Sequence, residues 1–386
     1  MIIEIKERPS RLRCGLCALA FAFAFILVFY LYGRSDAIPR EPIARTASLY
    51  DAASADGEFE RLLDEFYSLL PSEMEADISS VSFDKLMLLI SSALTDGVGG
   101  AVSELSTMLG VCLLLTLCEG GLVKGALGEL SSAGAMGILS IPLSASLFSV
   151  ANTVGNAIEA GCDFFGGMIP IATAATALSG AGTSAAAEAA GMSLALGFVS
   201  NMLLENLIPT VALMLAFSMA SAFDTGGIVG SLGSSLKGIL LFVMGFISFL
   251  LPATLSFQSV ISSAKDSMAL RSAKYAVGNM IPIVGGAISS MLSTLISGAT
   301  LAKSTVGALS SVAIGVIFAA PLVSLILLRL AYKITVCFLE FVGVSLGKRV
   351  FSSLMGALDA MIAMLCMSGA IFFLESVIFM RSVVSL

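Results

Sequence analysis

The stretch from Pro252 to Gly286, PATLSFQSVISSAKDSMALRSAKYAVGNMIPIVGG, carries a small charged centre between two long uncharged runs, 238–264 and 275–302. The centre consists of three cations and one anion: Lys265, Arg271, Lys274 and Asp266. A helix needs about 20 apolar residues to cross a bilayer, so each run is long enough to span. We therefore expect the centre to be a loop at the membrane surface. We expect the cytoplasmic side, because Lys and Arg favour that side in short loops.

The composition of the whole chain agrees with a membrane protein. Hydrophobic residues make up 57%, charged residues only 12%, and the mean hydropathy is +1.00, far from the balance of soluble domains. The 37 glycines favour helices that pack closely through small residues. We predict an all-α, polytopic helical membrane protein with about eight transmembrane segments, some of them broken or re-entrant.

The first 37 residues resemble a secretory signal. A basic start, with Lys6, Arg8 and Arg11, precedes an apolar stretch at 14–32, and small residues follow at 35–37. The apolar stretch is longer than that of a typical signal peptide. Residues 1–37 are therefore either a cleaved signal peptide or an uncleaved signal anchor.

Residues 38–104 form a distinctly acidic segment, with 13 Asp and Glu residues against four cations. After a signal sequence, this segment should lie outside the cytoplasmic membrane. Apolar residues recur at helical spacing in 59–70 and again in 83–94, where Ser82 can cap the helix. The two amphipathic helices either cover the protein's own outer face or dock a partner.

We assign residues 105–386 to a multi-helix transmembrane domain. The expected crossings lie near 104–123, 133–157, 164–180, 188–222, 238–263, 279–302, 306–328 and 353–380. Alternation of the loops places Arg329, Lys333 and Lys348 on the cytoplasmic side, in agreement with the positive-inside rule. The Gly/Ser-rich segment that ends at Lys237 is interpreted as an outer re-entrant or interfacial piece.

Two of these segments differ from simple spans. Residues 188–222 are too long for one straight crossing, and Pro209 should kink or break them. Residues 279–302 begin at Asn279, contain Pro282 in their first turn and are rich in Gly and Ser. This composition is typical of a broken helix that lines a polar space, because irregular backbone must be shielded from lipid. An ordinary, weakly apolar helix is the alternative.

Glu188 and Glu205 interrupt otherwise uncharged stretches and are candidates for lining a solute or ion path. The alternative places Glu188 at a helix end and Glu205 against a neighbouring helix. The chain has no histidine, which excludes Ser-His and Cys-His nucleophile pairs and imidazole metal ligands. We therefore expect no enzymatic activity, no catalytic or metal-binding residues and no cofactor.

The run from Ala273 to Gly286 resembles the signature region of the stage III sporulation protein AE family. The segments 259–266, 301–307 and 167–170 fit the same family, and the resemblance extends over roughly residues 83–380. These motifs consist of small residues, prolines and a few charges, so they identify a fold better than a chemistry. The motif positions are Lys265, Arg271, Lys274, Gly278, Asn279, Pro282, Gly285, Lys303 and Gly307.

The resemblance implies a membrane component of the channel, or feeding apparatus, that links mother cell and forespore and is needed for spore development. It implies a multi-pass location in the mother-cell membrane around the forespore. The implied partners are other proteins of the same sporulation operon and a forespore-side partner across the intermembrane space. A homo-oligomer is compatible with this function, and nucleic acid is not an expected partner. The rival interpretation is a self-sufficient secondary transporter or permease.

Overall fold

The computed structural model describes residues 83–120, 126–178, 181–223, 228–280 and 285–381. Within these ranges the chain is entirely helical. The elements are α5 (Phe83–Gly120), α6 (Ala126–Leu178), α7 (Gly182–Phe198), the π-helix η2 (Val199–Leu204), α8 (Glu205–Phe223), α9 (Ile228–Met280), α10 (Gly285–Val342) and α11 (Ser345–Arg381). The all-α prediction is confirmed for the described residues.

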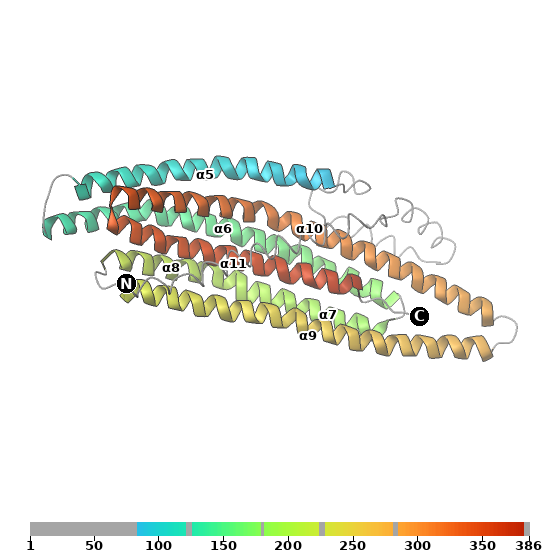
Figure 1. Ribbon diagram of the computed structural model, residues 1–386. Coiled ribbons are helices and arrows are strands. Elements are labelled where there is room, and N and C mark those ends of the chain that lie inside the picture. The colour runs from blue at the N-terminus through green and yellow to red at the C-terminus, as the bar shows by residue number, and fades with distance from the viewer. Residues whose placement is uncertain (1–82, 121–125, 179–180, 224–227, 281–284, 382–386) are drawn as a thin grey trace, which may run out of the picture.

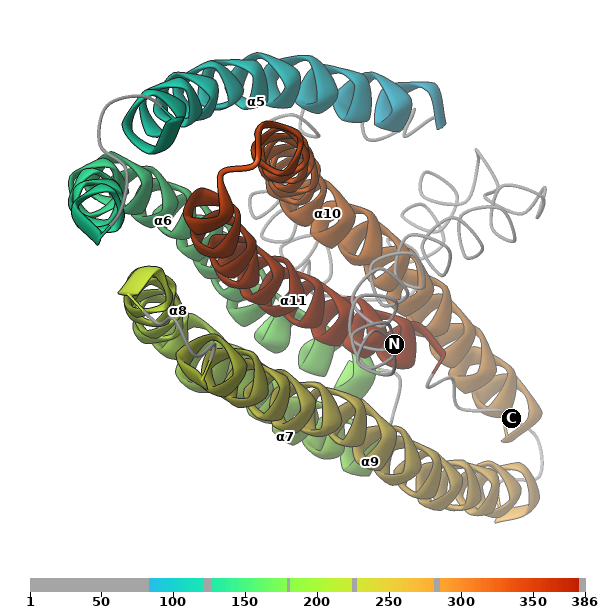
Figure 2. The same cartoon turned by 60° about the vertical axis from the view of Figure 1, so that its left-hand side comes forward.

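The helices run side by side in one elongated bundle (Figure 1). Helix α11 occupies its centre and contacts α6, α7, η2, α8, α9 and α10. Helix α5 packs on α10 and α6 at one side, whereas α9 packs on α7, α8, α10 and α11 at another (Figure 2). The connected ends of α9 and α10 extend past the other helices (Figure 1).

Several helices are far longer than a bilayer requires. Helices α6 and α9 have 53 residues each and α10 has 58, which corresponds to about 80 Å at 1.5 Å per residue. Internal prolines at 142, 170, 252 and 321 do not end these helices. Among the residues that the structure describes, five segments are long and apolar enough to cross a membrane: Val98–Thr116, Gly182–Ser218, Gly233–Ser272, Leu309–Val342 and Gly347–Met380.

The structure therefore corrects several sequence-based boundaries. The expected crossing 133–157 and the described part of the expected crossing 164–180 belong to the single helix α6, which ends at Leu178. Residues 285–302 are the first part of the continuous helix α10 and not a separate re-entrant segment. The charged centre around Lys265 is helical rather than a loop, because no proline interrupts α9 between Pro252 and its end at Met280. The helix ends two residues before Pro282, since proline restricts the residue that precedes it.

The signal sequence and most of the acidic segment lie outside the described residues. The amphipathic helix expected at 83–94 is confirmed as helical, and it continues through the proposed boundary at 104/105 to Gly120. That domain boundary stays a prediction.

The segment 182–223 stays helical across Pro209, with a π-helical turn at Val199–Leu204 just before the proline. Pro209 therefore does not break the helix, and the local change of helical register lies at Val199–Leu204, before the proline. The π turn leaves backbone carbonyls to be satisfied by other donors. The Asn206 side-chain amide donates to the carbonyl oxygens of Asn201 (3.2 Å) and Met202 (3.0 Å).

Helices α10 and α11 are joined by a tight turn at Gly343. Its φ of +86° lies in the left-handed region that glycine adopts without steric cost. The backbone N–H groups of Gly343 and Val344 both donate to the carbonyl of Leu339, which caps the end of α10. The turn brings α11 back along α10 and so into the centre of the bundle.

The core at the centre of the bundle is aromatic. The Phe372 ring of α11 stacks on Phe165 of α6 with centroids 4.5 Å apart, and lies 6.4 Å from the ring of Phe318 on α10. All three side chains are buried. Offset and tilted ring pairs of this kind are more favourable than their buried area alone implies. This cluster therefore fixes α6, α10 and α11 at a common level.

Candidate functional site

The motif positions do not converge on one site. Lys265 and Arg271 lie on α9 with exposed side chains, and Lys265 borders an open groove of about 570 Å³ between α7 and α9. Lys274, Gly278 and Asn279 lie on α9, whereas Gly285 and Lys303 lie on α10; the side chains at these positions, and all of Pro282, are outside the described parts.

Gly307 has a packing role. It is buried on α10, and a Cβ placed on it would lie 2.9 Å from Cβ and 3.2 Å from Cα of Met380 on α11. A backbone atom at that distance cannot move aside without shifting the helix. Glycine at this motif position therefore permits the close approach of α10 and α11.

Asp266, next to Lys265 in the charged centre, points into the bundle and caps α7. Its carboxylate accepts hydrogen bonds from the backbone N–H groups of Thr183 (3.2 Å) and Ser184 (2.7 Å), and from the Thr183 hydroxyl. These are unpaired donors of the first turn of α7, which begins at Gly182. An anion also interacts favourably with the positive end of the helix dipole. The only anion of the charged centre therefore ties α9 to the start of α7.

We expect Asp266→Ala to destabilise the α7–α9 contact by about 1–2 kcal/mol, the usual range for loss of an N-terminal cap. The measurement is the thermal stability of the purified full chain in detergent. The matched control is Lys265→Ala, which removes an exposed side chain from the adjacent position. Equal stability of the two variants would show that Asp266 has no capping role.

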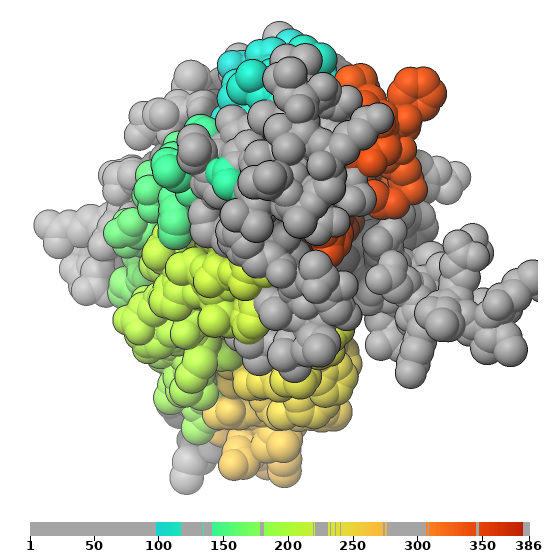
Figure 3. All heavy atoms as spheres, turned by 90° about the vertical axis from the view of Figure 1, so that its left-hand side faces the viewer, coloured from blue at the N-terminus to red at the C-terminus, as the bar shows by residue number. Residues whose placement is uncertain are grey.

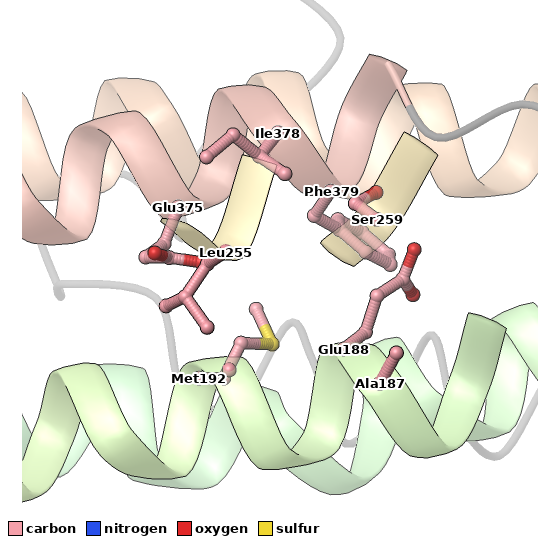
Figure 4. A pocket seen from close by; sticks show the side chains of 9 residues that line it. Ala187, Glu188, Met192, Leu255, Ser259, Glu375, Ile378 and Phe379 are labelled. Atoms are coloured by element: carbon pink, nitrogen blue, oxygen red, sulfur yellow. The ribbon is translucent and has the colours of Figure 1, made fainter. Parts of the chain in front are cut away.

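Two carboxylates reach a small, partly open cavity between α7, α9 and α11 (Figure 4). Glu188 of α7 is 7% exposed and accepts a hydrogen bond of 2.6 Å from the Thr176 hydroxyl. Glu375 of α11 is 4% exposed, and its Oε1 atom has no hydrogen-bond partner among the described residues. The cavity has a volume of about 20 Å³, which is room for one water molecule.

The two candidate lining residues, Glu188 and Glu205, lie in different places in the structure. Glu188 lines this cavity together with Leu255 and Ser259 of α9. Glu205 is exposed at the start of α8 and is not among the residues that line it. Glu375 was missed, although the reasoning that selected Glu188 applies to it, because it too interrupts an apolar stretch.

One charged contact joins three helices, α9, α10 and α11. Asp359 of α11 accepts hydrogen bonds from Lys237 of α9 (2.9 Å) and from Arg329 of α10 (2.5 Å). The three side chains are 17%, 19% and 32% exposed, respectively. Removal of one partner from such a contact is costly, because the remaining charge is then partly buried without compensation. This triad holds α9, α10 and α11 at one level.

The triad also overturns part of the expected membrane topology. Lys237 was placed at the outer side and Arg329 at the cytoplasmic side, yet both bind one carboxylate. Two residues that share an acceptor cannot lie on opposite sides of a bilayer about 30 Å thick. The residues pair across 122 and 30 positions, so helical spacing could not reveal them.

Comparison with known proteins identifies the family of the chain. The chain matches the family model described as stage III sporulation protein AE over residues 66–382. It is 27% identical over 234 residues to stage III sporulation protein AE of Bacillus subtilis (strain 168), which covers 60% of this chain and 58% of the relative. The aligned part thus spans less than two thirds of that relative, and no solved structure matches the chain. Because the family model covers most of the sequence, the chain belongs to the stage III sporulation protein AE family.

Proposed function

We propose that the protein is a non-enzymatic, multi-pass membrane subunit of the channel that links mother cell and forespore, and that spore development requires it. The observation that carries the proposal is family membership over residues 66–382, which assigns the chain to sporulation. Long apolar helices support a place within a membrane. The proposed location is the mother-cell membrane around the forespore.

The proposed role is one of assembly rather than chemistry. The chain contains no histidine for proton relay or nucleophile activation. Two carboxylates of its interior serve helix contacts: Asp266 caps α7, and Asp359 joins Lys237 to Arg329. The proposed partners are proteins of the same sporulation operon and a forespore-side protein across the intermembrane space.

Affinity purification of the tagged full chain from membranes of sporulating cells tests this proposal. We expect the other proteins of the operon to be recovered, and an unrelated tagged multi-pass protein to recover none. Deletion of residues 57–82 should weaken this recovery, because it shortens the acidic segment while leaving every described helix intact. Recovery of no operon protein by the full chain would contradict the proposal.

The alternative is a self-sufficient secondary transporter. The observation that favours it is the cavity between α7, α9 and α11, where Glu188 and Glu375 are buried. Buried carboxylates at membrane depth are typical of proton-coupled transporters. A volume of about 20 Å³, however, admits a water molecule and no larger solute. Saturable, gradient-driven uptake by the purified protein in vesicles would favour the transporter, and we expect none.

A further inference from the structure

Helix α6 presents a polar surface to the outside of the bundle. Its exposed residues recur at spacings of three and four, which places them along one face of the helix. We call this surface the polar face of α6, and it consists of Ser149, Asn152, Thr153, Asn156, Glu159 and Asp163. The opposite face of the same helix, with Ile158 and Phe165, is buried in the core.

The polar face lies at the same depth as the aromatic core. Asp163 is two residues from Phe165, whose ring stacks on Phe372 at 4.5 Å. On α11, Met367 lies against α9, where a Cβ placed on Gly245 would be 3.3 Å from its Cε atom. The end of the polar face that carries Glu159 and Asp163 is therefore level with the part of α9 around residue 245.

At that same depth α9 presents an apolar surface. Phe242, Phe246 and Phe249 are 69%, 55% and 74% exposed, and the candidate span Gly233–Ser272 is only 18% buried. Exposed aromatic and aliphatic side chains over such a length match a lipid environment. In an end-on view α6 and α9 occupy different sides of the molecule, with the α8 segment between them (Figure 3). The bundle thus has an apolar side and a polar side at one depth.

Lipid is an unfavourable neighbour for the polar face. Each carboxylate at the centre of a bilayer costs about 2.5–3.5 kcal/mol on insertion scales. Within the described residues neither Glu159 nor Asp163 has an ion-pair partner. The adjoining helices extend the polar surface, because Asn201 and Glu205 are exposed near Leu204, which lies beside Gly155 of α6. Water is the environment that satisfies all these groups.

The bundle cannot hold that water in its own interior at this depth, where Phe165, Phe318 and Phe372 fill the centre. The water must therefore lie outside the bundle and be screened from lipid by further protein. Neighbouring protein can pack on the exposed apolar side chains of Met202 and Ile208, which lie close to Glu205 in the sequence. Copies of this chain, arranged around a common axis, would each turn the polar face of α6 inward. They would thereby enclose the water and separate it from lipid.

We propose that several copies of this chain enclose a water-filled lumen lined by the polar face of α6, with α9 facing lipid. This inference rests on the proposed role in a channel, and it identifies the pore-lining surface. Because the lining carries Glu159 and Asp163 and no cation, the lumen concentrates cations over anions. Rings of carboxylates have this effect in cation channels.

Cysteine accessibility in membranes of sporulating cells tests the lumen. On a cysteine-free background, Asn156→Cys and Ala160→Cys probe exposed positions on the outer side of α6, whereas Phe242→Cys and Phe246→Cys are the controls at nearly the same depth on α9. The membranes are permeabilised, so that charged methanethiosulfonate reagents reach both surfaces. We expect the α6 positions to react at least about 10-fold faster than the α9 positions, because a charged reagent needs water.

Equal reaction rates at the two faces would overturn the proposal. Protection of the α6 positions that ends only after detergent extraction would also overturn it, since a different protein or the lipid would then cover the face. The third overturning result is failure of two differently tagged copies of the chain to co-purify. None of these outcomes depends on recovery of operon proteins. Failure of the lumen proposal can therefore be distinguished from failure of the proposed function.

The charge of the lumen lining is tested separately, by comparing the reaction rates of a cationic and an anionic reagent. At Asn156→Cys the cationic trimethylammonium reagent should react about 10-fold faster than the anionic sulfonate reagent, after correction for their rates with a free thiol. In the added presence of Glu159→Gln and Asp163→Asn this preference should disappear. A ratio that is unchanged by these two substitutions would contradict a lumen lined by the carboxylates.

Discussion

Replacement of Asp359 by alanine is expected to reduce the stability of the bundle by about 3–5 kcal/mol, the cost of leaving partly buried charges without their partner. Asp359 is the shared acceptor of Lys237 at 2.9 Å and of Arg329 at 2.5 Å. Its loss leaves two like charges close together on α9 and α10. The measurement is the fraction of monodisperse protein that remains in detergent after heating, compared with the unchanged chain.

Two controls sharpen this prediction. Glu340→Ala removes an ion pair with Lys348 of similar length, 2.5 Å, but with side chains that are 62% and 43% exposed, so an effect below about 1 kcal/mol is expected. The triple substitution Lys237→Met, Arg329→Leu and Asp359→Leu should recover much of the lost stability, because it leaves no unpaired charge. A stable Asp359→Ala protein would show that the triad does not hold the three helices.

Phe372→Ala is expected to cost about 3–5 kcal/mol, because it opens a cavity at the centre of the bundle. Phe372 is fully buried and contacts Phe165 and Phe318, which belong to two other helices. In a membrane the stability that is lost comes mainly from van der Waals packing of the ring, since lipid is as apolar as the protein interior. The same heating measurement in detergent checks this prediction.

Phe249→Ala is the matched control, because this side chain is 74% exposed on α9. It removes the same atoms from a surface that lipid or detergent can refill, so we expect little change in stability. Equal losses for Phe372→Ala and Phe249→Ala would contradict the assignment of Phe372 to the core and of α9 to the apolar surface.

The sequence predicts the helical class well and the helix boundaries less well. Uncharged runs in 238–264 and 306–328 indicate membrane helices. The first run lies within α9 and the second within α10. The charged centre at Lys265 was interpreted as a loop, because charge usually marks a membrane surface. A few charges do not end a helix, however, whereas a proline restricts the residue that precedes it. Helix α9 therefore ends at Met280, two residues before Pro282, and α10 begins at Gly285.

The charged contacts were the part least accessible from sequence. Glu188 was selected because it interrupts an apolar stretch, and the structure buries it beside a cavity. Glu205 was selected by the same reasoning and is exposed. Burial depends on which face of a helix meets its neighbours, and in a glycine- and alanine-rich helix both faces look alike in the sequence.

Composition and periodicity by themselves determined that the chain is helical, apolar enough for a membrane and without histidine chemistry. The motif from Ala273 to Gly286 predicted the family that the comparison confirmed. Only the tertiary structure decided that Asp359 pairs with Lys237 and Arg329, and that α6 is polar on its outer face where α9 is apolar. The physical reason is that these relations join residues on different helices, and their relative positions follow from the packing of the whole bundle rather than from local spacing.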